Sequence, residues 1–254
     1  MITQQPEPQY LYCFFRGSEP EIFTSKGMGD RGDRVSSIHY RDLGLVMSAS
    51  PESEYYNTRR NMMTHTKVLE EVMANRTILP IRFNTIAPEK KDVYKLLKRR
   101  YDELQGRLSE MDGKIEMGLK ALWYEGIVFE EILATHSEIR KLRDSLQGKS
   151  PNATYYQRIR LGEMVEVALK QKLQNEEEEI LSHLRPIVVK VRTNQLITDR
   201  MIVNAAFLVD REKEAELDAA IQELDAKMGQ RILFRYVGPV PPYNFVNVMI
   251  SWNN

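Results

Sequence analysis

Residues 238–246, with the sequence GPVPPYNFV, decide how the last part of this chain folds. Their three prolines fix φ at about −65° and remove backbone N–H donors, so the segment is neither helix interior nor central strand. Residues 232–237 and 245–250 on either side are rich in β-branched and aromatic side chains, which is typical of strands. The sequence therefore predicts a stiff, extended connector between two strands. A rigid turn that closes a sheet is a sufficient structural explanation of this pattern.

The composition is that of an ordinary globular protein, because 42% of the 254 residues are apolar. This length accommodates one large domain or two small ones. The 36 basic residues balance the 36 acidic ones, which argues against a nucleic-acid-binding protein. Cys13 is the only cysteine, so no intramolecular disulfide can form and a reducing, cytosolic compartment is expected.

No targeting or membrane segment is recognisable in the sequence. Residues 1–6 lack the basic and then apolar pattern of a signal peptide. No run of about 20 apolar residues is available to cross a bilayer. We therefore expect a protein that meets an apolar surface by docking on it.

The N-terminal third alternates strands and loops. Residues 10–15 are almost all apolar or aromatic, which indicates a central strand covered on both faces. Residues 17–33 are predicted to be a polar, glycine-bearing loop. Strands follow at 35–40 and 43–49, and the two residues between them are few enough for a tight hairpin.

The loop contains Gly27, Gly29 and Gly32 in the pattern G-x-G-x-x-G. Dinucleotide binding by this pattern requires a helix directly after it, because the helix N-terminus binds the pyrophosphate. The residues that follow resemble a strand instead. We therefore expect the glycines to permit a flexible hairpin-type loop.

A helix is predicted at residues 50–74, with Ser50 as N-cap and proline at its first position. His65 lies on its apolar stripe. One interpretation makes His65 a general base. The sequence favours a histidine at the edge of the core with a hydrogen-bonded partner, because no carboxylate or nucleophile is tied to it by spacing.

Residues 77–83 are predicted to form a strand. Pro80 inside it places the strand at a sheet edge or a bulge. Arg82 in such an apolar segment is expected to need a carboxylate or carbonyl partner, most simply in a structural salt bridge.

The second half is predicted to contain helices at 88–111, 127–147, 152–185 and 212–229, and strands at 115–124, 187–191, 201–209 and 232–237. From residue 115 the order is strand, helical pair, strand, strand, helix, strand, as in a ferredoxin-like βαββαβ domain. The prediction is an α+β protein of two domains, a small N-terminal α+β domain at 1–112 and a modified ferredoxin-like domain at 113–254. An extended, coiled-coil-like helical hairpin at about 127–185 is inserted in the second, and residues 245–250 complete its sheet.

No catalytic or metal-binding pattern stands out. The histidines have no H-x-x-x-H spacing, and there is no C-x-x-C, nucleophile elbow or complete phosphate loop. Paired carboxylates are expected on solvated helix faces. We therefore expect a protein that is not an enzyme and has no metal and no cofactor.

Three stretches resemble the gas vesicle protein GvpL/GvpF family. They are His65-Thr-Lys-Val68, then Leu79-Pro-Ile-Arg-Phe83, then Gly238-Pro-Val-Pro-Pro-Tyr-Asn-Phe245. The last resembles the family's C-terminal signature Gly-Pro-x-Pro-Pro-Tyr-x-Phe. Asn84 stands where the family usually has glycine, and asparagine tolerates left-handed backbone better than most residues.

The resemblance implies a minor structural protein, associated with the gas vesicle shell and needed for shell assembly and hence buoyancy. It implies GvpA, the small hydrophobic major shell protein, and other assembly proteins as partners, with neither nucleic acid nor membrane. The implied location is the vesicle in the cytoplasm, at its gas-facing side. The candidate partner-binding or family-motif residues are Leu79, Pro80, Arg82, Phe83, Gly238, Pro239, Pro241, Pro242, Tyr243 and Phe245.

Two other classes of function stay open from the residues alone. The first is a ferredoxin-like regulatory protein that binds a small metabolite. The second is an enzyme whose site assembles from distant residues, which needs a deep pocket holding His65 or carboxylates with perturbed pKa values.

Overall fold

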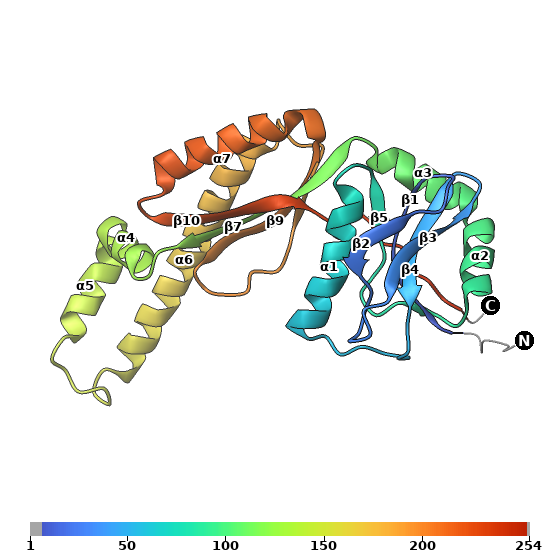
Figure 1. Ribbon diagram of the computed structural model, residues 1–254. Coiled ribbons are helices and arrows are strands. Elements are labelled where there is room, and N and C mark those ends of the chain that lie inside the picture. The colour runs from blue at the N-terminus through green and yellow to red at the C-terminus, as the bar shows by residue number, and fades with distance from the viewer. Residues whose placement is uncertain (1–6, 253–254) are drawn as a thin grey trace, which may run out of the picture. The chain divides into compact units, whose positions relative to one another are not determined.

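The computed structural model describes residues 7–252 (Figure 1). Contacts between Cα atoms divide the chain into two compact units. The first contains the residues up to Glu116 and those from Pro239 onward, and the second is Met117–Gly238. The prediction that residues 245–250 complete the sheet of the second domain is therefore wrong. Apart from a single parallel bridge between Ile81 and Val248, this segment forms no strand.

An antiparallel sheet of six strands forms the centre of the first unit in the described residues. Its strands are β1 (Gln9–Arg16), β2 (Ile22–Lys26), β3 (Arg34–Tyr40), β4 (Leu43–Ala49), β5 (Ile78–Pro80) and β6 (Ile86–Ala87). They are ordered β2-β3-β4-β1-β5, and β6 also pairs with β1. The central position predicted for the first strand and the tight turn between β3 and β4 are both confirmed.

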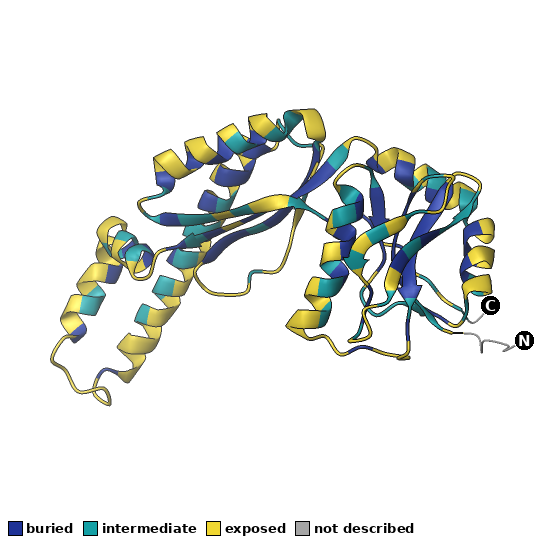
Figure 2. Cartoon of the chain, viewed as in Figure 1, coloured by how far each residue is buried: buried dark blue, intermediate teal, exposed yellow. Residues whose placement is uncertain are grey.

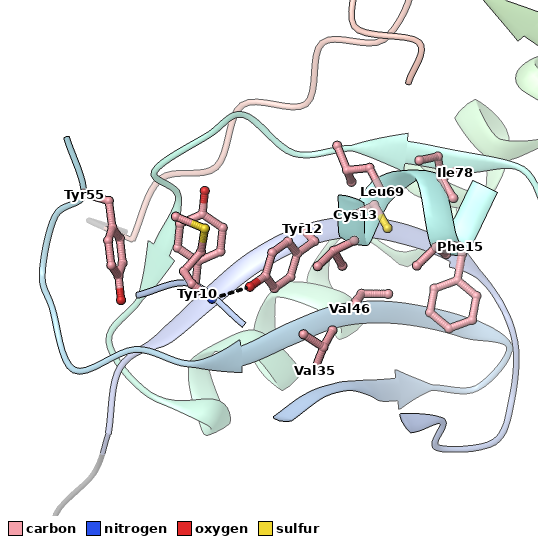
Figure 3. Packing of buried hydrophobic residues seen from close by; sticks show 12 residues of the cluster. Tyr10, Tyr12, Cys13, Phe15, Val35, Val46, Tyr55, Leu69 and Ile78 are labelled. Atoms are coloured by element: carbon pink, nitrogen blue, oxygen red, sulfur yellow. Dashed lines mark hydrogen bonds between the residues drawn. The ribbon is translucent and has the colours of Figure 1, made fainter. Parts of the chain in front are cut away.

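Three helices cover this sheet, α1 (Arg59–Met73), α2 (Lys90–Arg99) and α3 (Tyr101–Met111). Figure 1 shows α1 on one face and the other two helices on the opposite face. This arrangement explains why β1 is buried almost throughout. Val68 and Leu69 of α1 pack on Tyr12 and Val46 of the sheet in one core, drawn in Figure 3.

Two boundaries in the first unit differ from the prediction. Helix α1 begins at Arg59 because Thr58 caps it, accepting a hydrogen bond from the amide of Asn61. Ser50 instead donates its hydroxyl to the Glu52 carbonyl and forms a turn. The predicted helix at 88–111 is two helices that break at Arg100, whose φ of −107° and ψ of 17° are not helical.

The polar stretch at 17–33 contains strand β2, which the sequence did not reveal. Its glycine pattern joins β2 to the antiparallel strand β3, so no helix follows it. The loop is anchored where the amide of Met28 donates to the Tyr12 hydroxyl at 3.0 Å. The glycine pattern is thus part of a hairpin, as the sequence indicated.

The second unit is built on strands β7 (Lys114–Trp123), β8 (Lys190–Thr193), β9 (Met201–Asp210) and β10 (Ile232–Val240). They are ordered β10-β7-β9-β8. Its helices are α4 (Ile127–Thr135), α5 (Ser137–Leu146), α6 (Tyr155–Leu184) and α7 (Glu214–Met228), with a 3-10 turn at Arg211–Lys213 before α7. The predicted helix at 127–147 breaks at His136, and α4 and α5 both pack against α6.

Burial differs along α6. Its C-terminal half contributes Ile180, Leu181 and Leu184 to the core. Its N-terminal part and α5 are mostly exposed, as the yellow ribbon in Figure 2 shows. These two helices therefore form an arm that is anchored at one end only.

Candidate functional site

His65 is the polar centre of the first unit. The spacing of α1 puts it on the same face as Val68, Leu69 and Val72, and only 1% of its surface is exposed. Its ring is stacked on Tyr12, with 5.6 Å between ring centroids and 25° between planes. The histidine is thus a core residue, as the sequence favoured.

Both ring nitrogens of His65 have tyrosine partners. Nδ1 lies 3.0 Å from the Tyr10 hydroxyl, and Nε2 lies 2.7 Å from the Tyr243 hydroxyl. The Tyr243 hydroxyl donates to the Ile81 carbonyl, so it accepts from Nε2–H. Nδ1 then accepts from Tyr10, whose oxygen in turn accepts from the amide of Asn84. Every group in this chain of hydrogen bonds is satisfied when the imidazole is neutral.

Burial explains the protonation state of this cluster. It lowers the pKa of His65 to about 4, because the imidazolium would lose its hydration. The same desolvation raises the pKa values of Tyr10 and Tyr243 well above their ordinary range. His65 is therefore neutral at physiological pH, and both its nitrogens are already bound. This geometry holds two chain segments together and does not present a general base to a substrate.

The chain segments that the His65 cluster holds together contain two of the motifs noted in the sequence. We call residues 81–84 together with residues 243–248 the tail junction. Besides the bonds of Tyr243, it contains the parallel bridge between Ile81 and Val248. Arg82 donates Nη2 to Asn247 Oδ1 at 3.1 Å. Segments that are far apart in the sequence thus form one site.

A buried carboxylate fixes the C-terminal side of the tail junction. Glu116 accepts from the backbone amide of Asn244 at 2.9 Å and from its side-chain amide at 2.6 Å. Two hydrogen bonds to one carboxylate define both the position and the orientation of Asn244. The backbone amides of the next two residues, Phe245 and Val246, donate to the Pro242 carbonyl at 3.2 and 2.9 Å.

The ten predicted site residues fall into three groups by exposure. Leu79, Pro80, Pro241 and Pro242 are buried, Phe83, Pro239 and Phe245 are partly buried, and Arg82, Gly238 and Tyr243 are exposed. Tyr243 keeps 40% of its surface accessible although its hydroxyl points inward. The prediction placed Arg82 inside a strand, most simply with a salt bridge. The strand position and the salt bridge are wrong, since Arg82 follows β5 and is exposed. Its partner is the side-chain carbonyl oxygen of Asn247, which is the other kind of partner that the sequence allowed for.

Asn84 adopts the left-handed conformation that the sequence allowed for, with φ of 66°. Its side chain also makes a contact that glycine could not make. Oδ1 accepts from the backbone amide of Tyr55 at 2.8 Å. Asparagine therefore ties the turn at the tail junction to the segment before α1.

A second buried polar cluster lies in the second unit, and the sequence did not reveal it. Glu176 is buried, and its carboxylate accepts hydrogen bonds from Trp123 Nε1 and Arg231. Arg231 also makes a two-point contact with Glu131, at 2.6 and 2.7 Å. Lys172 lies 2.7 Å from Glu131 and 3.0 Å from Glu176. These bonds hold the pKa of Glu131 low, at about 2, chiefly through the Arg231 guanidinium.

The expectation that carboxylates lie on solvated helix faces is therefore wrong for Glu176. The spacing of Glu176 could have indicated its burial. It falls three residues after Leu173 and four before Ile180, and therefore on the apolar face of α6. A carboxylate in such a seam needs cationic or N–H partners.

Within residues 7–252, no group of three or more histidine, cysteine or acidic side chains is arranged to hold a metal ion. In the same part of the chain, no helix is both long and apolar enough to cross a membrane.

Comparison with known proteins gives consistent matches along the chain. Residues 8–247 match the family described as "Gas vesicle synthesis protein GvpL/GvpF". The chain is 28% identical over 244 residues to gas vesicle protein F of Dolichospermum flosaquae, covering 95% of this chain and 98% of the relative. It is 31% identical over 238 residues to gas vesicle protein F of Streptomyces sp. (strain CB03234), covering 93% and 98%. The crystal structure of GvpF from Anabaena sp. PCC7120 is similar with a TM-score of 0.83 and 26% identity, covering 96% of this chain and 100% of that one.

Proposed function

The chain belongs to the GvpL/GvpF family of gas vesicle synthesis proteins, and we propose that it is a minor structural protein that supports assembly of the gas vesicle shell. Its main partner in this proposal is the major shell protein GvpA, and other assembly proteins are further partners. The role is not enzymatic. It consists of binding new shell subunits, covering their apolar surface and delivering them to the growing shell, so that the vesicle gives buoyancy.

The tail junction supports this proposal, because the segments that resemble the family meet there. The buried members, such as Leu79 and Pro242, hold the backbone. The accessible parts of Arg82, Tyr243 and Phe245 then form the surface offered to GvpA. Complete burial of a fully exposed aromatic side chain gains about 1.5–3 kcal/mol, and these partly exposed side chains gain a part of that when a partner covers them. Arg82 adds hydrogen-bond donors at the margin of this surface.

Capture of purified GvpA by the immobilised protein tests this assignment. Arg82→Glu and Phe245→Lys place charges on the tail junction, and we expect each to reduce capture strongly while the circular dichroism spectrum stays unchanged. Substitutions of Leu79 are unsuitable, because that side chain is fully buried. Tyr56→Lys is the matched control, since Tyr56 is 86% exposed and lies outside the tail junction. Equal capture by folded Arg82 and Phe245 variants would refute the surface.

We also propose that the protein lies on the gas-facing side of the shell. Protease treatment of intact and collapsed vesicles distinguishes the two sides. A gas-facing protein resists a protease until the vesicles are collapsed by pressure, whereas digestion of the protein in intact vesicles would contradict this location.

We further propose that the two units are separate domains and that the second is a modified ferredoxin-like domain with an extended helical hairpin. Its strand order β10-β7-β9-β8 and its helix order support this. A Cβ atom built on Gly118 lies 3.2 Å from Val237 Cγ2, so the chain leaves and re-enters this unit at adjacent points. Replacing residues 119–236 by a short glycine-serine linker therefore tests the proposal. A cooperative unfolding transition of the shortened chain is expected, and its absence would show that the first unit depends on the second.

A further inference from the structure

The end of the helical arm is strongly basic. We call residues 139–160 the arm tip, which contains most of α5, the following loop and the start of α6. It carries six basic residues and one acidic residue in a chain whose net charge is zero. The acidic residue, Asp144, is already bound by Arg143 at 2.6 Å. Arg140, Lys141 and Arg160 are exposed and have no side-chain partner among residues 7–252.

Two tyrosines lie among these charges. Tyr155 is 59% exposed and Tyr156 is 81% exposed, and their rings meet edge to face with 5.4 Å between centroids. Exposed tyrosines combined with arginine are typical of surfaces that bind a partner. The arm tip thus offers long, cationic and aromatic side chains that the chain itself does not cover.

Helix α7 presents the opposite kind of surface. Residues 212–225 contain six acidic residues and one basic residue. Leu217, Ile221 and Leu224 face the core, and the acidic face of α7 is the opposite side. That face is formed by Glu212 in the 3-10 turn before α7 and by Glu216, Ala219, Glu223 and Ala226 of α7, all exposed. Glu223 also lies 3.4 Å from Nε2 of His183 on α6. The alanines leave room between the carboxylates for long side chains.

These two surfaces are too far apart to neutralise each other within one chain. Lys227 of α7 binds Glu179 of α6 at 2.7 Å, whereas the arm tip is at the other end of α6, near Tyr155. At about 1.5 Å per residue, the helix separates these points by about 36 Å. Charges separated by more than about 10 Å are largely screened at 0.1 M salt. Figure 1 shows α5 and α7 at different ends of α6.

We propose that the arm tip of one chain binds the acidic face of α7 on a second copy of the chain. Charge complementarity supports a second copy, because the segments 139–160 and 212–225 carry equal and opposite excesses of charge within a chain that is neutral as a whole. The contact joins different surfaces, so a bound pair of copies still offers one free arm tip and one free acidic face. Association is therefore head-to-tail and open-ended. It does not depend on binding to GvpA.

Sedimentation velocity of the purified full chain tests this proposal over a range of concentrations. At about 0.05 M salt the sedimentation coefficient is expected to rise with protein concentration. At about 0.5 M salt this rise is expected to disappear, because salt screens the attraction between the two surfaces. A chain that stays monomeric at every concentration in low salt contradicts the proposal.

Charge reversal identifies the surfaces. The tip variant R140E/K141E/R160E and the face variant E212K/E216K/E223K are each expected to lose self-association when alone. An equimolar mixture of the two is expected to recover it, because each tip then meets a face of opposite charge. Recovery in the mixture is not expected if the arm tip binds another acidic protein, a membrane or RNA. Failure to recover, or association that survives either variant, overturns the proposal.

The face variant needs a second form, because lysines at the start of α7 oppose the helix dipole. E212Q/E216Q/E223Q removes three of the six acidic charges without this effect and is expected to lose association as well. Far-UV circular dichroism confirms that the helices are intact in every variant. The matched control is E177Q/E178Q, which removes two acidic charges from α6 outside both surfaces and is expected to leave association unchanged.

Discussion

The hydroxyl of Tyr243 lies 2.7 Å from Nε2 of His65, although 178 positions separate the two residues along the chain. This bond joins α1 to the C-terminal segment of the first unit. It also explains why the proline-rich connector has one defined position, since a stiff segment needs few contacts to fix it.

Removing the Tyr243 hydroxyl is expected to destabilise the protein. Tyr243→Phe leaves the buried Nε2–H of His65 without an acceptor, which costs about 1–3 kcal/mol in the free energy of unfolding. Urea denaturation measures this value. Tyr56→Phe removes an exposed hydroxyl and is expected to change stability by less than about 0.5 kcal/mol. Equal effects of the two substitutions would mean that the bond to His65 contributes nothing.

Acid is expected to act on the other ring nitrogen of His65, because protonation of Nδ1 removes the acceptor of the hydrogen bond from Tyr10. The pKa of His65 is about 4 in the folded protein, below its ordinary value of 6.5, so the unfolded chain binds the extra proton first. The stabilisation from neutral His65 is complete above pH 6.5 and is lost as the pH falls toward 4. A shift of this size corresponds to roughly 3 kcal/mol.

Unfolding free energies measured across this pH range, for the natural chain and for His65→Gln, isolate this contribution. The variant has no imidazole to titrate, so its stability should decline less steeply between pH 6.5 and 4. Parallel curves for the two proteins would show that His65 does not take up the proton.

At Asn84, alanine is expected to be worse than glycine. Both substitutions remove the bond from the Tyr55 amide, but only alanine keeps a Cβ at a φ of 66°. Left-handed backbone costs a residue with a Cβ about 1–2 kcal/mol, whereas glycine adopts it readily. Thermal unfolding of the two variants should therefore rank Asn84→Gly above Asn84→Ala, and the reverse order would contradict this explanation.

Glu176 is expected to be the most sensitive carboxylate of the second unit. Glu176→Leu leaves Trp123 Nε1 and one side of Arg231 without a partner, and breaking a buried ion pair in this way costs about 3–5 kcal/mol. Glu131 still binds Arg231, so the lower end of this range is expected. Glu178→Gln is the control, because its pair with Arg185 is exposed. Similar losses of stability in both variants would exclude a special role for Glu176.

Local signals in the sequence predicted local structure well. The hairpin of β3 and β4 follows from two strand-like runs and a two-residue turn, which are all adjacent in the chain. The predicted helix start at Ser50 was wrong, because a serine before a proline also suits a turn. The capping hydrogen bond of Thr58 shows that the helix begins after Thr58 instead.

The candidate site required information that no local pattern contains. The sequence marked Leu79–Phe83 and Gly238–Phe245 separately, and it placed His65 on an apolar face. It could not show that they meet, because pairing of distant segments depends on the whole fold. The burial of Glu176 was missed for the same reason, since Trp123 and Arg231 approach it from other elements.

The sequence of the second unit is inserted into that of the first, and this order has a consequence for synthesis of the protein on the ribosome. The first unit is interrupted after Glu116 and is completed only by residues from Pro239 onward. At translation rates of about 5–20 residues per second, Tyr243 is made roughly 10 seconds after Glu116. During that interval His65 has no tyrosine for its Nε2–H, and the edge beside Ile81 is uncovered. The nascent chain is therefore exposed to misassociation until the residues from Pro239 onward are made, when the second unit can already have folded.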